Sequence, residues 1–129
     1  PSQPEFVLEG FLHDFGDLAR SAANTGDEDA EDLSTVRLDE ALFAELAKGF
    51  VSGARDALSP EEIRHMPLAM ETITYELGMR FLTDYLDGDI YFRTKRPAQN
   101  LDRARVHFKL LQCMQQSRGA LERVVEGLL

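Results

Sequence analysis

Residues 67–86 read PLAMETITYELGMRFLTDYL, and this stretch decides the fold. Its apolar residues point in nearly every direction around a helix axis, which is typical of a helix at the centre of a domain. Pro67 suits the first turn of a helix, and Gly88 favours a stop just after Leu86. The sequence therefore predicts a long central helix over residues 67–86, against which the other elements pack.

A stripe of charged residues interrupts this apolar helix. Glu76, Arg80 and Asp84 are spaced four residues apart, so they lie on one face with the arginine between two carboxylates. In one interpretation the face is exposed, and each ion pair contributes only about 0.3–0.5 kcal/mol. In the other, the two acids hold Arg80 at the floor of a cleft, where its guanidinium donates to ligand hydroxyls or oxygens. Tyr91 either packs in the ordinary way or adds a ring face and a hydroxyl to that cleft.

Weaker helical patterns precede the central helix. Residues 1–13 contain two prolines and a glycine, and an irregular or extended lead-in is expected there. A short helix is expected over residues 14–23, where the apolar side chains have helical spacing. Asp39 is expected to cap a further helix that ends near residue 56.

Helix signals continue on both sides of the central helix. The sequence Ser-Pro-Glu-Glu at residues 59–62 predicts a helix start with a capping box. Asn100 is expected to cap a last long helix over residues 101–117, and a final turn follows at residues 121–128. Because no strand ladder appears, the sequence predicts a single all-α domain over residues 1–129 with about five to six helices.

The chain is acidic, with 23 Asp and Glu against 14 Lys and Arg and a net charge of −9. This charge disfavours nucleic acid and anionic membrane surfaces as partners. Five of the six residues at 27–32 are acidic, and a solvated, mobile loop over residues 24–38 is expected. A calcium loop of the EF-hand type is disfavoured, because its glycine and distal glutamate are missing.

The remaining reactive side chains give no strong signal. Cys113 lies in an apolar run, where a buried structural thiol is expected, and one cysteine is consistent with a reducing cytoplasm. His13, His65 and His107 lie far apart, and none has a His or Cys at metal-ligand spacing. Neither a transmembrane span nor a signal peptide is expected. The first residue is proline, so we expect a processed product or a fragment.

Three blocks of sequence carry a resemblance to a known family. They are residues 13–25 (HDFGDLARSAANT), residues 78–92 (GMRFLTDYLDGDIYF) and residues 100–110 (NLDRARVHFKL). In order and spacing they resemble the C-terminal segment of bacterial aminoglycoside phosphotransferase-like sugar kinases, of the N-acetylhexosamine 1-kinase type. Some members of this family are labelled mucin-desulfating sulfatases, but the chain has no Cys-x-Pro-x-Arg sulfatase signature.

The resemblance implies a protein-kinase-like fold in which this chain is the helical end of the C-lobe. In that family an arginine and a tyrosine of this segment contact the amino-sugar, and the matching residues are Arg80 and Tyr91. Glu76 and Asp84 would then hold Arg80 in place. The resemblance places the Asp-Phe-Gly at residues 14–16 after the metal-binding segment, so it is not expected to bind metal.

The resemblance also implies what lies elsewhere in the enzyme. The phosphate-covering loop and catalytic loop of a kinase have no counterpart in these 129 residues. The chain is therefore expected to be inactive alone, with no catalytic residue and no cofactor of its own. ATP and magnesium are expected for the full-length enzyme, and the remainder of the kinase chain and an amino-sugar are the expected partners. A stand-alone helical module that binds another protein remains the alternative, and dimerisation through exposed core surface is left open.

Overall fold

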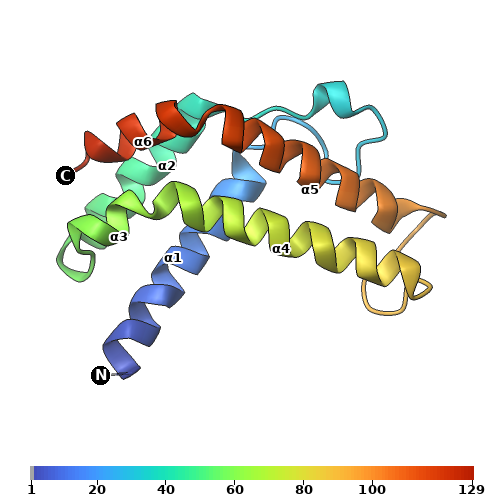
Figure 1. Cartoon of the computed structure of the whole chain (residues 1–129), viewed down its shortest axis with the longest axis horizontal. Coiled ribbons are helices and arrows are strands. Elements are labelled where there is room, and N and C mark those ends of the chain that lie inside the picture. Colours follow the sequence, from blue (N-terminus) through green and yellow to red (C-terminus); the bar gives the residue numbers. More distant parts are fainter. Residues whose placement is uncertain (1) are drawn as a thin grey trace.

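Helices form nearly all of the regular structure in residues 2–129 (Figure 1), and 71% of the chain is helical. The computed structural model describes the backbone of these residues and the side chains of residues 10–54 and 56–129. Six α-helices are present in this part of the chain: α1 (Ser2–Ala22), α2 (Glu40–Gly53), α3 (Pro60–Arg64), α4 (Met66–Leu86), α5 (Gln99–Gln116) and α6 (Arg118–Glu126). Two short 3-10 turns, η1 (Leu33–Thr35) and η2 (Arg55–Ala57), lie between them. The all-α prediction is confirmed.

The predicted central position of α4 is also correct. In Figure 1, α5 runs alongside α4 and α1 crosses it, and these two helices make most of its contacts. Both approaches depend on glycine. A Cβ on Gly16 of α1 would lie 2.7 Å from the carbonyl oxygen of Ala69, and a Cβ on Gly78 of α4 would lie 2.9 Å from the Phe108 ring. A larger residue at either position would push the helices apart.

The hydrophobic core lies where α1, α2, α4, α5 and α6 meet. Its largest fully buried side chains are Phe15, Phe43, Met66, Met70, Leu110, Met114 and Leu121. The rings of Phe15 and Phe43 pack edge to face with their centroids 5.7 Å apart. Burial of each such side chain contributes about 1.5–3 kcal/mol, so this cluster supplies the main driving force for folding.

Two predicted helix starts are confirmed in detail. The Oγ of Ser59 accepts from the backbone N–H of Glu62 at 3.2 Å, and the Glu62 carboxylate accepts from the backbone N–H of Ser59 at 2.8 Å. The carboxylate of Asp39 accepts from the N–H of Leu42 at 3.0 Å. These contacts satisfy N–H groups that have no partner inside their own helix.

The irregular lead-in expected at residues 1–13 was wrong from residue 2 onward, while residue 1 lies outside the described residues. A single helix, α1, runs from Ser2 to Ala22. Proline is tolerated in the first turn of a helix, and one glycine inside it costs only about 1 kcal/mol. Packing outweighs that cost, because the Phe11 ring of α1 packs against the Phe50 ring of α2 with the two ring centroids 6.5 Å apart.

The expected cap at Asn100 was also wrong. The helix begins at Gln99, two residues earlier than predicted, and Ala98, with φ of 61°, occupies the N-cap position without a side-chain bond. Asn100 lies inside the first turn and its side chain is fully buried. Its amide therefore serves contacts outside the helix, which belong to the candidate site.

The side chains of Arg20, Arg96 and Gln99 bind the acidic loop between α1 and α2. Arg96 donates to the carbonyl oxygen of Asp29 at 2.9 Å, and Gln99 donates to the Asp29 carboxylate at 3.0 Å. Glu28 lies 3.6 Å from Arg20 of α1. The expectation of a mobile, solvated loop left out these partners. No helix within residues 2–129 is both long and apolar enough to cross a membrane.

Candidate functional site

Asp84 organises the loop that follows α4. Its carboxylate accepts from three consecutive backbone N–H groups, those of Ile90 at 3.0 Å, Tyr91 at 2.7 Å and Phe92 at 3.0 Å. The chain reverses direction just before, at Gly88 with φ of 97° and Asp89 with φ of 61°. A left-handed conformation is easy for glycine and tolerable for aspartate. The turn therefore returns the backbone to the helix end and fixes Tyr91 there.

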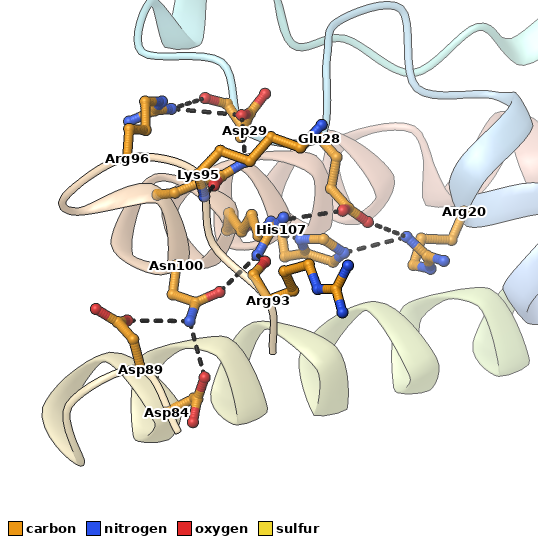
Figure 2. Close-up of polar contacts among 12 residues, drawn as sticks. Arg20, Glu28, Asp29, Asp84, Asp89, Arg93, Lys95, Arg96, Asn100 and His107 are labelled. Atoms are coloured by element: carbon orange, nitrogen blue, oxygen red, sulfur yellow. Dashed lines mark hydrogen bonds and ion pairs between the residues drawn. The ribbon is translucent and has the colours of Figure 1, made fainter. Parts of the chain in front are cut away.

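Asn100 completes the environment of Asp84. Its amide nitrogen donates to Asp84 at 2.8 Å and to Asp89 at 3.0 Å (Figure 2), and its oxygen accepts from Arg103 at 2.8 Å. Burial alone would raise the pKa of the Asp84 carboxyl, but the backbone donors and the Asn100 amide outweigh it and hold that pKa below its ordinary value. Asp84 is therefore an ionised, nearly buried anchor.

Arg80 is held differently from the sequence-based expectation. In the described part of the chain, no ion pair joins Arg80 to Glu76 or Asp84. Both oxygens of Asp84 instead accept from the loop, and one of them also accepts from Asn100. The Cζ of Arg80 instead lies 5.6 Å from the centroid of the Tyr91 ring and 5.8 Å from that of Phe92. Such cation–π contacts contribute about 0.5–1 kcal/mol each at exposed sites.

An open cleft of about 590 Å³, here called the Arg80 cleft, lies on this face of α4. Its wall on the helix includes Thr72, Tyr75, Glu76, Met79, Arg80 and Thr83, and the loop adds Tyr91 and Phe92. Asp84 and Asp87 complete the lining at the end of the helix. The structure thus brings all four sequence-predicted site residues, Glu76, Arg80, Asp84 and Tyr91, to one cleft. The Arg80 guanidinium lies over the Tyr91 ring, and Asp84 anchors the loop.

Six lining residues were not predicted as site residues from the sequence: Thr72, Tyr75, Met79, Thr83, Asp87 and Phe92. Tyr75 and Met79 lie one turn apart on α4, and Asp87 follows its last turn. Tyr75 is 53% exposed and Met79 is 41% exposed, so both present apolar surface to the cleft. The spacing of Tyr75 and Met79, four residues apart beside the charged stripe, could have indicated a shared face of the cleft. In an apolar helix, however, the same spacing is equally typical of core residues.

No protein-family model matches the chain. The chemistry of the cleft therefore rests on its own residues. It offers aromatic faces, one guanidinium, carboxylates and hydroxyls, which is a composition suited to binding a polar ligand with an apolar face. Among the side chains of residues 10–54 and 56–129, no group of three or more His, Cys, Asp or Glu is arranged to hold a metal ion.

A buried histidine lies behind the cleft. The Nδ1 of His107 lies 2.7 Å from the carbonyl oxygen of Arg103, which can only accept, so Nδ1 carries the proton. The Nε2 atom then accepts from Arg20 at 3.2 Å (Figure 2). Burial lowers the pKa of His107, with Arg20 adding to that effect, while the carbonyl of Arg103 and nearby carboxylates oppose it. His107 is therefore a neutral packing residue, in van der Waals contact with the Phe81 ring.

Cys113 has a plainer environment than the other reactive side chains. It is half-buried rather than buried, and its Sγ lies 3.7 Å from the carbonyl oxygen of Val36. This contact helps to join α5 to the end of η1. It gives the thiol no neighbour that would make it a nucleophile.

Proposed function

We propose that this chain is the sugar-binding helical region of an ATP-dependent kinase that phosphorylates an N-acetylhexosamine or a related sugar. One observation carries the proposal: Arg80 and Tyr91, the two residues that the family resemblance assigns to the sugar, lie with guanidinium and ring 5.6 Å apart in one open cleft. They come from different elements, since Arg80 is on α4 and Tyr91 is on the loop after it. ATP and magnesium would bind to the remainder of the kinase chain.

The composition of the Arg80 cleft fits a pyranose. A sugar ring has an apolar face of C–H groups and a rim of hydroxyls. The exposed rings of Tyr75 and Tyr91 match the first, and the side chains of Thr72, Glu76 and Asp87 match the second. The lining has three carboxylates, those of Glu76, Asp84 and Asp87, against the one guanidinium of Arg80, so a neutral ligand suits it better than a polyanion.

The two central residues have distinct roles in this proposal. Arg80 has donors and no acceptor, so it would bind ligand hydroxyl oxygens or the carbonyl oxygen of an acetamide group. The Tyr91 ring, 74% exposed, would cover the apolar face of the sugar. Asp84 would contribute indirectly, because it holds the backbone of Tyr91 in place.

Ligand titration tests the proposal directly. N-acetylglucosamine and N-acetylgalactosamine, added to the isotope-labelled chain, should shift the NMR signals of Arg80 and Tyr91. Arg80→Ala should weaken binding about 10- to 100-fold, the equivalent of one hydrogen bond to a charged group. Arg105→Ala removes an arginine outside the Arg80 cleft and should leave binding unchanged. The assignment would be excluded if Arg80→Ala left both the sugar affinity of the chain and the turnover of the full-length enzyme unchanged.

A second candidate function is a module that binds another protein. It is favoured by large apolar side chains that remain exposed on and just after α4, namely Leu68, Tyr75, Met79, Leu86 and Ile90. Contiguous exposed apolar patches mark protein interaction surfaces as well as ligand-binding grooves. This alternative gains support if neither sugar shifts any signal of the cleft and the chain self-associates in sedimentation experiments.

A further inference from the structure

A second cleft lies beside the first along α4. This cleft, here called the histidine cleft, has a volume of about 480 Å³. Its lining includes Leu12 and His13 of α1, His65 at the start of α4, and Leu68, Thr72 and Glu76 of α4. Thr72 and Glu76 line both clefts. The two clefts therefore adjoin at these two side chains, and together they are here called the groove.

The histidine cleft has the same kind of chemistry as the Arg80 cleft. His13 and His65 are exposed, and each neutral imidazole offers one donor and one acceptor. Within the described residues, neither imidazole is used in a hydrogen bond, and His65 does not cap α4 with its side chain. Leu12 and Leu68 supply apolar surface next to them. Hydroxyl-binding groups thus again border an apolar floor.

The groove is longer than one sugar ring. Its lining on α4 runs from Leu68 to Asp87, which at about 1.5 Å per residue corresponds to roughly 28 Å along the helix axis. Clefts of a few hundred Å³ each enclose a drug-sized ligand, and a single hexose is smaller than that. One monosaccharide at Arg80 would leave the histidine cleft empty.

We propose that the ligand of this groove is an oligosaccharide of at least two sugar units, with one unit in the Arg80 cleft and the next in the histidine cleft. This rests on the proposed function, because it takes the Arg80 cleft as the first sugar site. His13 and His65 bind hydroxyls of the second unit from opposite elements, α1 and the start of α4. Glu76, in the shared wall, is placed to accept from both units.

The test compares one sugar with two. The chain is titrated with N-acetylglucosamine, with N,N′-diacetylchitobiose and with N-acetyllactosamine, and dissociation constants are measured by NMR. At least one disaccharide should bind about tenfold or more tightly than the monosaccharide and should shift the signals of His13, His65 and Leu68. The double variant with His13→Ala and His65→Ala should lose this gain and keep its affinity for the monosaccharide. His13→Gln with His65→Gln should recover part of the gain, because glutamine retains a donor and an acceptor.

The outcomes separate this inference from the proposed function. If N-acetylglucosamine binds in an Arg80-dependent way but neither disaccharide binds more tightly, the oligosaccharide assignment is overturned and the sugar site stands. A gain that survives the double alanine variant also overturns it. If no sugar binds to the chain at all, both proposals fail. The histidines are exposed, so circular dichroism is expected to show an intact fold in every variant.

Discussion

The side-chain amide of Asn100 donates to Oδ2 of Asp84 over 2.8 Å, and this contact fastens α5 to the loop that carries Tyr91. The same nitrogen lies 3.0 Å from Oδ1 of Asp89, in the turn between helix and loop. Asn100 is fully buried, so water cannot easily replace it, and both carboxylates would lose a donor if the amide were removed. The position of Tyr91 is thus set partly by a residue of another helix.

Substitution of Asp84 by asparagine should release the loop while leaving the helices folded. An amide has only one oxygen acceptor, and its NH₂ group would face backbone N–H donors that now bind both carboxylate oxygens. The backbone amides of residues 90–92 should exchange with solvent at least about tenfold faster, as measured by hydrogen exchange. Affinity for N-acetylglucosamine should fall in parallel.

Asp87→Asn is the matched control for the exchange measurement alone, because Asp87 is exposed near the same helix end but also lines the Arg80 cleft. Equal exchange rates in both variants and the parent chain would contradict the anchoring role.

Acid should release the loop in the same way as the Asp84 substitution, because it protonates the Asp84 carboxylate. The folded pKa of Asp84 lies below the unfolded value of 3.8, so its stabilising contribution is present above pH 3.8 and is lost as the pH falls through the folded pKa.

Mild acid should destabilise the fold through His107. Its pKa is lowered from 6.5 in the folded state, so the unfolded chain binds the proton more readily. The free energy of unfolding should decrease as the pH falls from about 6.5 to the folded pKa, by at most about 1.4 kcal/mol per pH unit. Protonated Nε2 would face the guanidinium of Arg20, now at 3.2 Å.

Urea unfolding at a series of pH values measures this dependence, and His107→Gln should flatten it between pH 6.5 and the folded pKa. A slope of the same size in the glutamine variant would assign the effect to other groups. The asparagine variant at position 84 should keep the slope in this window, because the Asp84 carboxyl that it removes titrates at lower pH.

Gly16→Ala should destabilise the protein by about 1–3 kcal/mol, as for other overpacked contacts. The added Cβ would meet the carbonyl oxygen of Ala69 at 2.7 Å, and a backbone atom cannot move aside without displacing α4. Gly49→Ala is the control, since nothing lies within 4 Å of that Cβ. Inside α2 it should stabilise by about 0.5–1 kcal/mol. If the urea midpoints of both variants shifted in the same direction, the close approach of α1 to α4 would be contradicted.

Arg96→Ala should loosen the acidic loop at residues 27–32. The guanidinium lies 2.7 Å from the carboxylate of Asp102 and donates to the carbonyl of Asp29 at 2.9 Å, so its loss removes a bridge from α5 to the loop. A protease that cleaves after acidic residues should cut there several times faster. Arg105→Ala, whose side chain only approaches Asp102 at 4.0 Å, should not change the cleavage pattern.

Sequence patterns were sufficient for the features that depend on neighbouring residues. The central position of α4 follows from apolar residues all round its axis, and the capping box at Ser59 depends on atoms three residues apart. The lead-in failed because tertiary packing of Phe11 overrode two weak helix breakers. The capping box depends on residues close together in the sequence, whereas the helical lead-in depends on a contact between the distant residues Phe11 and Phe50.

The site was only partly predictable for the same reason. Spacing placed Glu76, Arg80 and Asp84 on one face, but it could not reveal that Asp84 would turn to the backbone of the loop. That arrangement requires the left-handed turn at Gly88 and the distant Asn100. Likewise, nothing local connects His13 with His65, which share a cleft only because α1 crosses α4.

The shared amide of Asn100 has a consequence for natural variation. A chain that replaces Asp84 removes one of the two acceptors of the buried Asn100 amide, and one that replaces Asn100 leaves a nearly buried carboxylate short of a donor. Either single step carries a penalty that a second, compensating change can remove. Across orthologues, positions 84, 89 and 100 should therefore exchange as a linked set rather than drift independently.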